Sequence, residues 1–139
     1  MTGGFLEMKK LTKKEVKSMA LEIIELLCSD DYKDFWSHIA VYAGGNVYSS
    51  EPFQGNGKNH WIVNGEKVYI SEEIEPNFSS YLPNAKDHIL SMTFEGDLSR
   101  VIGYDVDMPE FMDKFGSIFQ KSSVFFECME SWNLTCYPA

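Results

Sequence analysis

Apolar residues recur every three or four positions in the first part of the chain. Between residues 12 and 28 they form one stripe, with polar residues opposite: Val16, Met19, Ala20, Ile23, Ile24 and Leu27. Thr12 and Glu15 have the spacing of a capping box, in which each side chain binds the backbone N–H of the other residue. This pattern predicts an amphipathic helix that ends near Cys28.

A similar spacing continues after a polar break at Ser29 to Asp31. Tyr32, Phe35, Trp36 and Ile39 favour a shorter second helix over residues 31–40, packed on the first. The pair Gly44-Gly45 is expected to end this helical part of the chain.

Beyond Gly45 the apolar positions change to a spacing of two, which is typical of strands. Strands are expected over residues 46–50, 60–63, 67–70, 88–95 and 98–106, with a long polar connection over 71–86. The strongest turn signal is Asn64-Gly65, because both residue types tolerate the positive φ angles of a type I′ hairpin. Leu90, Met92 and Phe94 should point to a buried face.

A third helix is predicted after Asp107, which is expected to cap it, with Pro109 near its first turn. Its apolar stripe is Phe111, Met112, Phe115, Ile118 and Phe119. Residues 124–129 and 132–137 then favour a closing hairpin, although 124–129 could instead extend the helix. The sum is one α+β domain over 1–139: two N-terminal helices, a mostly antiparallel sheet of about five to seven strands, one late helix, and a loose tail over 1–10.

Composition supports a packed intracellular domain. Hydrophobic residues make up 44% of the chain, enough apolar material to build a core. No apolar run approaches the roughly 20 residues that cross a membrane, and no secretory signal is visible, so a cytoplasmic protein without a membrane partner is expected. Three cysteines form no disulfide framework, and Cys136 is the one thiol worth testing for reactivity.

The charge is unevenly divided along the chain. The formal net charge is −9. Residues 1–71 carry 8 basic and 9 acidic side chains, whereas residues 72–139 carry 4 basic and 12 acidic ones. Such a field repels nucleic-acid phosphates and attracts a basic partner, so a basic protein is the expected ligand and direct nucleic-acid binding is not expected.

No motif for catalysis, metal or cofactor binding is present in the sequence. His38, His60 and His88 are far apart, and neither a Cys-x-x-Cys nor a His-Glu-x-x-His spacing occurs. A Gly-x-Ser-x-Gly elbow and a phosphate-binding Gly-Lys loop are also missing. We therefore predict no catalytic residues, no metal and no cofactor.

The candidate binding residues are acidic and lie in the second half of the chain. Four carboxylates surround the expected strand–helix junction: Asp105, Asp107, Glu110 and Asp113. Glu127 and Glu130 add further negative charge, and Trp132 is a candidate aromatic anchor. These residues favour an acidic docking surface, and the alternative is an ordinary solvated helix start.

These features together are typical of a protein that binds and blocks another protein. A small, acidic, single domain without catalytic residues has the general profile of immunity proteins and of phage anti-defence inhibitors, which enter basic clefts quickly. A second hypothesis is an apolar pocket for a small molecule, lined by Trp36, Tyr42, Tyr48, His60 and Tyr69, with His60 as acid–base. A third is a role within a homo-oligomer, which an apolar strand edge would favour.

Overall fold

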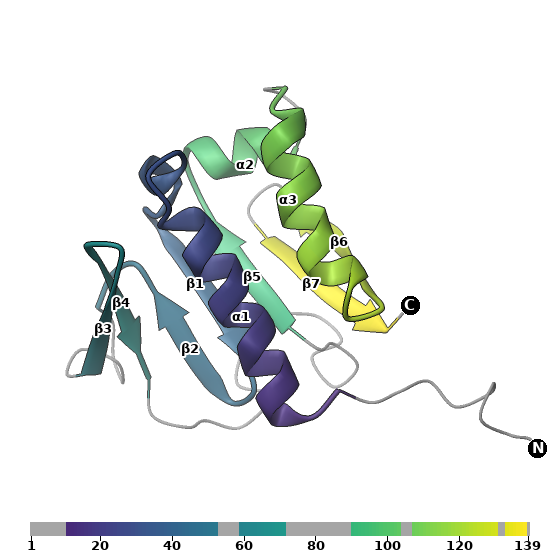
Figure 1. The fold of residues 1–139 in the computed structure, drawn as a ribbon, viewed down its shortest axis with the longest axis horizontal. Coiled ribbons are helices and arrows are strands. Elements are labelled where there is room, and N and C mark those ends of the chain that lie inside the picture. Colours follow the sequence, from purple (N-terminus) through teal and green to yellow (C-terminus); the bar gives the residue numbers. More distant parts are fainter. Residues whose placement is uncertain (1–10, 53–58, 72–89, 104–106, 131–132, 139) are drawn as a thin grey trace, which may run out of the picture.

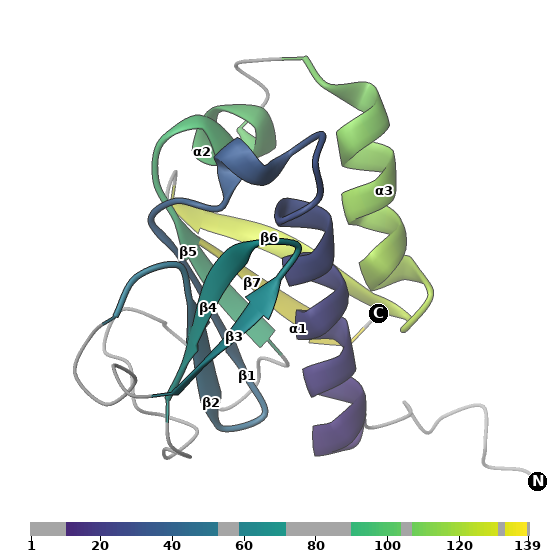
Figure 2. The ribbon, with the colours of Figure 1, turned by 60° about the vertical axis from the view of Figure 1, so that its left-hand side comes forward.

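Two long helices lie side by side over one face of an antiparallel sheet (Figure 1, Figure 2). The computed structural model describes residues 11–52, 59–71, 90–103, 107–130 and 133–138. The described helices are α1 (Lys13–Leu27), α2 (Asp97–Ile102) and α3 (Pro109–Gln120), with a short 3₁₀ helix η2 (Lys33–Phe35). The strands are β1 (Ile39–Ala43), β2 (Asn46–Ser49), β3 (Asn59–Val63), β4 (Glu66–Ile70), β5 (Leu90–Phe94), β6 (Val124–Glu130) and β7 (Asn133–Pro138). The predicted α+β class is confirmed.

The seven strands form one sheet in the order β3-β4-β2-β1-β5-β7-β6, and every neighbouring pair is antiparallel. Because side chains alternate along a strand, each strand presents one set to the helices and the other set to the opposite face. In β5, Leu90, Met92 and Phe94 point to the helices, as predicted, whereas Ser91 and Thr93 point away.

Helix α1 forms as its sequence predicts. The Thr12 N–H donates to Glu15 Oε1 at 3.0 Å, and the Glu15 N–H donates to Thr12 Oγ1 at 3.1 Å, which completes the capping box. The six apolar residues of the predicted stripe are all buried. The backbone N–H of Cys28 closes the helix on the Ile24 carbonyl.

The second helix predicted over residues 31–40 is wrong. This segment forms the single turn η2 and then enters β1, whose residues alternate between buried and half-buried. His38 separates the two with a φ of 58°, which no continuous right-handed helix accommodates. Gly44 and Gly45, with φ of 62° and 88°, make the β1–β2 hairpin turn rather than a helix end.

The strand predicted over residues 98–106 is also wrong, because residues 97–102 form helix α2. Leu98, Val101 and Ile102 are buried at helical spacing, and Ser99 Oγ donates to the Gly96 carbonyl just before the helix. Residues 104–106 lie outside the described part of the chain. Asp107 does not cap α3: Met108 holds that position without a side-chain hydrogen bond, and Pro109 opens the helix as expected.

Both predicted hairpins are present. Asn64 and Gly65 have φ of 49° and 87°, as a type I′ turn requires between β3 and β4. Strands β6 and β7 pair as the closing hairpin, with an irregularity between Cys128 and Glu130, and α3 ends before them. The long connection predicted over 71–86 falls almost wholly outside the described residues.

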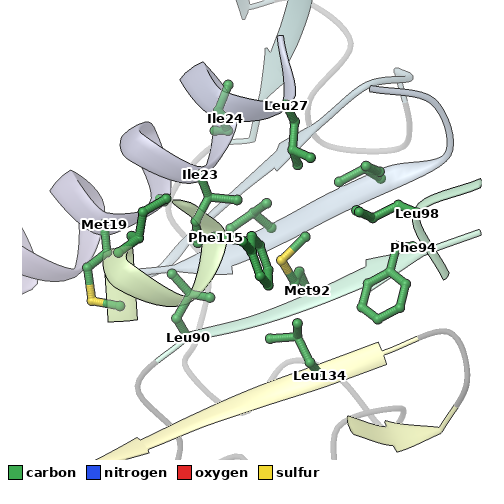
Figure 3. Packing of buried hydrophobic residues seen from close by; sticks show 14 of the residues in the cluster. Met19, Ile23, Ile24, Leu27, Leu90, Met92, Phe94, Leu98, Phe115 and Leu134 are labelled. Carbon is green, nitrogen blue, oxygen red and sulfur yellow. The ribbon is translucent and has the colours of Figure 1, made fainter. Parts of the chain in front are cut away.

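The hydrophobic core lies between the sheet and helices α1 and α3 (Figure 3). Phe115 is fully buried at its centre. Its ring lies 5.6 Å from Phe111, 5.1 Å from Phe119 and 5.5 Å from Phe126. The rings of Phe115 and Phe119 contact that of Phe126 and so hold α3 against β6, while Met19, Ile23 and Leu27 pack α1 against the central strands.

Candidate acidic binding site

The structure gathers some of the predicted acidic residues and separates others. Asp107, Glu110 and Asp113 are exposed at the start of α3. Glu127 is exposed on β6 but points away from the helices, because its neighbour Phe126 packs against Phe115 and Phe119. Asp105 and Trp132 lie outside the described residues, and of Glu130 only the backbone is described.

Carboxylates from other segments lie at the same end of the molecule as the start of α3. In Figure 1 this end is uppermost, where η2, the β5–α2 junction and the first turn of α3 meet. We call it the acidic end, and it comprises Asp30, Asp31, Asp34, Glu95, Asp97, Asp107, Glu110 and Asp113. All eight side chains are exposed. The fold therefore brings the carboxylates of residues 30–34 to the same end of the molecule as those of residues 95–97 and 107–113.

A cluster of aromatic rings holds these segments in place. The Tyr32 ring lies 5.0 Å from the ring of Phe111, and the Phe35 ring lies 5.2 Å from it, both edge to face. Phe111 is fully buried and Tyr32 nearly so. Since Phe111 belongs to the first turn of α3, η2 is fixed directly against the helix that carries Glu110 and Asp113.

Cations only partly offset this charge. Lys33, Arg100 and Lys114 lie within or next to these segments and leave a net of five negative charges when they are counted against the eight carboxylates. Lys114 Nζ lies 3.5 Å from Glu110 and 5.6 Å from the centre of the Tyr32 ring, and Lys33 Nζ lies 3.8 Å from Asp30. Because the charges near the acidic end do not cancel, its negative field remains available to attract a basic partner.

Sequence reasoning missed Asp30, Asp31 and Asp34 because they lie in the half of the chain whose charges nearly cancel. The positive charges that cancel them include Lys13, Lys14 and Lys17, which lie at the other end of α1. A helix of 15 residues separates its two ends by about 22 Å, so the two groups do not share a surface. The break at Ser29 to Asp31 was the available signal, since it marks a helix end where the chain returns to solvent.

A small hollow lies on the sheet face away from the helices. Its volume is about 180 Å³, and its lining includes Ala40, Ser49 and Thr93, which occupy one cross-strand row. The hollow exists because these side chains are small. At its rim His38 Nδ1 lies 2.8 Å from Glu51 Oε1, an exposed pair that fixes the orientation of the imidazole.

The five residues predicted to line an apolar pocket lie on two opposite faces of the sheet and do not form one pocket. Trp36 and Tyr48 belong to the core beneath the helices, where the Trp36 Nε1–H donates to the Lys67 carbonyl at 2.9 Å. Tyr42, His60 and Tyr69 lie on the opposite sheet face, as their cross-strand partners require. The histidine beside the hollow is His38 rather than His60.

All three cysteines are free thiols with different surroundings. Cys28 and Cys136 are fully buried, whereas Cys128 is exposed on the edge strand β6. Burial, together with the charge of Glu66, raises the pKa of Cys28 to about 12, and burial also raises the pKa of Cys136. Cys136, the thiol that the sequence singled out, is thus the least suited to react.

We expect one fast thiol and two slow ones when the native protein meets a disulfide reagent at neutral pH. Burial raises the pKa of Cys128 as well, but its side chain is exposed to the reagent, so it should react first. Cys28 and Cys136 should react at least about a hundredfold more slowly, because the reagent cannot reach them without an opening of the fold. The absorbance of the released thiolate measures the phases, and unfolding in urea should make all three equivalent. The Cys128→Ser variant must lose the fast phase; a single phase of three thiols in the native protein would contradict the assignment.

Within the described ranges, no group of three or more His, Cys, Asp or Glu residues is arranged to hold a metal ion. None of the described helices combines the length and the apolar character needed to cross a membrane. No protein-family model matches this chain, and no curated protein and no solved structure is significantly similar to it.

Proposed function

We propose that this protein is a stoichiometric inhibitor that binds a basic protein through its acidic end, in the manner of immunity proteins and phage anti-defence proteins. The convergence of eight exposed carboxylates from three segments carries this proposal. A partner with a positive cleft would be steered to this end and would meet several carboxylates at once.

Rigidity supports the same proposal. The Tyr32, Phe35 and Phe111 cluster holds η2 against α3 before any partner arrives, so little conformational entropy is lost on binding. The natural partner class is a nucleic-acid-handling protein, because its basic cleft has the charge opposite to that of the acidic end. The three free thiols suit the cytoplasm, which is where we propose that the protein acts.

The acidic end is a stronger candidate than the hollow beside His38. At about 180 Å³ the hollow is smaller than the roughly 300–1,000 Å³ of sites that enclose drug-sized molecules. His38 and Glu51 are also more than half exposed, so they would hold a ligand in contact with water. An extended charged surface depends on no such enclosure.

Charge reversal at the acidic end tests the proposal. Asp34→Lys combined with Asp113→Lys should weaken partner binding at least about tenfold, because both side chains are exposed and both belong to the acidic end. The matched control is Ser18→Lys, Gln120→Lys and Glu127→Lys together, which raises the net charge by the same four units at exposed positions away from the acidic end. The control should bind like the wild type.

The measurement is capture of the tagged wild type, reversal variant and control from source-cell lysate. Proteins eluted at increasing salt are identified by mass spectrometry, and the affinity of the purified partner is then measured by calorimetry. A basic protein that the wild type and control retain in near-equal amounts, and that the reversal variant loses, supports the proposal. Equal retention by all three proteins, or no stoichiometric partner for the wild type, would overturn it.

A further inference from the structure

Strand β3 forms one edge of the sheet and has an unusual composition for an edge. Its five residues, Asn59 to Val63, include no Asp, Glu, Lys, Arg or Pro. Among the described strands only β4 pairs with it (Figure 2). No described strand therefore pairs with the backbone N–H and C=O groups on the outer side of β3. Edges of this kind accept a further strand unless something prevents it.

The opposite edge of the same sheet carries the usual protection. Strand β6 bears the charged Glu127, and its pairing with β7 is irregular between Cys128 and Glu130. Charges and bulges are the devices by which proteins prevent edge-to-edge association. Of the two edge strands in the described part of the sheet, β3 is therefore the one that lacks these devices.

Two exposed apolar side chains on β3 indicate how a partner would approach. Trp61 is 44% exposed and Ile62 is 60% exposed. As neighbours in a strand they point to opposite faces of the sheet, and Trp61 is on the helix side, where its ring lies 5.9 Å from that of Tyr48. A partner resting on either face would cover one of them, whereas a strand added at the edge covers both.

We propose that the occupant of this edge is a second copy of the chain, with the two β3 strands antiparallel about a two-fold axis at Trp61. The two-residue turn at Asn64-Gly65 makes Val63 and Glu66 a hydrogen-bonded pair, as are Trp61 with Val68 and Asn59 with Ile70. The backbone groups of His60 and Ile62 therefore face outward. The two-fold register places His60 of one copy opposite Ile62 of the other, so that these outward groups all find partners.

The charges also fit a second copy. Two chains that each carry −9 repel one another over most of their surface, but β3 has no charged side chain. In the proposed register Val63 lies opposite Asn59 of the second copy, so the cross-strand neighbours are, in order, Glu66, Val63, and then Asn59 and Ile70 of the second copy. The row of Lys67 and Ile62 likewise continues into His60 and Tyr69. No carboxylate opposes another across the interface, and the pairing does not depend on the acidic end.

The first test is the oligomeric state over about a hundredfold range of concentration, measured by size-exclusion chromatography with light scattering. The wild type should reach twice the 15.9 kDa monomer mass. Ile62→Lys adds an edge charge and should raise the dimer dissociation constant at least about tenfold. Phe125→Lys makes the same change at an exposed position on β6 and should leave it unchanged. A wild type that stays monomeric throughout would overturn the proposal.

Cross-linking tests the register. In a Cys128→Ser background, Trp61→Cys should form an intermolecular disulfide when copper phenanthroline accepts the two electrons and the two thiol protons are released. Directly opposed residues of this pair type lie about 4.5 Å apart between Cα atoms, within disulfide range. Ile62→Cys should stay reduced, because the two-fold register separates the two copies of residue 62 beyond about 7 Å. Cross-linking of Ile62→Cys, or none of Trp61→Cys, would overturn the register, and a foreign protein cross-linked at residue 61 would replace the second copy as occupant.

Discussion

Replacement of Phe111 by alanine should lower the free energy of unfolding by about 3–5 kcal/mol. Phe111 is fully buried, and its ring contacts those of Tyr32, Phe35 and Phe115. Alanine would leave a cavity where η2 meets α3, so the fold and the geometry of the acidic end would suffer together. Urea unfolding followed by circular dichroism gives the free energy.

The matched control for Phe111→Ala is Phe125→Ala, since Phe125 is 43% exposed on the outer strand β6. Removing a ring that is already in partial contact with water should cost less than about 1.5 kcal/mol. Comparable losses for the two variants would contradict the assignment of Phe111 to the core. A total stability of about 5–15 kcal/mol is usual for a domain, so the expected loss at Phe111 is a large part of it.

Trp36→Ala is expected to have the second large effect, again about 3–5 kcal/mol. The indole is 6% exposed, and its Nε1–H donates to the Lys67 carbonyl in β4. Trp36 follows η2 directly, so its hydrogen bond connects the acidic end with the β3–β4 hairpin. Its loss would remove both the buried ring and the hydrogen bond.

Trp36→Phe separates these two contributions. Phenylalanine keeps an aromatic ring in the site but leaves the Lys67 carbonyl without its donor, which should cost about 1–3 kcal/mol. The same urea titration measures both variants. A loss below about 1 kcal/mol for Trp36→Ala would show that the indole does not hold the hairpin to η2.

Elements set by neighbouring residues could be predicted from the sequence. The capping box at Thr12 and Glu15 depends on atoms three residues apart, and the Asn64-Gly65 turn depends on the φ preferences of two residues. No tertiary contact has to be known for either. The same holds for α3, whose apolar stripe has one dominant period.

The segment at residues 31–40 could not be predicted because its helical spacing has another cause. Tyr32 and Phe35 pack against Phe111 of α3. The Trp36 Nε1–H donates to the Lys67 carbonyl, and Ile39 is buried as part of β1. Spacing alone reports that these side chains are buried, not that one helix buries them. The strand predicted over residues 98–106 is wrong for a related reason. Helix α2 has only six residues, and so short an apolar pattern does not distinguish a helix from a strand.

The acidic site was predicted only in part for a spatial reason. Asp107, Glu110 and Asp113 are close in sequence, so their proximity was visible without a structure. Asp30, Asp31 and Asp34 join them only because Tyr32 and Phe35 pack on α3. The sequence also groups Glu127 with these carboxylates, yet the alternation of side chains along β6 places it on the other face of the sheet.

The order of strands in the sheet has a consequence for the speed of folding. The centre of the sheet joins β1 to β5, with Ala43 opposite Leu90, and β7 lies between β5 and β6. These pairings close long loops, and the entropy of closure is lost before the contacts form. A protein with such distant contacts should fold in milliseconds to seconds, slower than a helical bundle of equal size. Throughout that interval the apolar strand β5 is without its partners, so folding at high concentration should compete with aggregation.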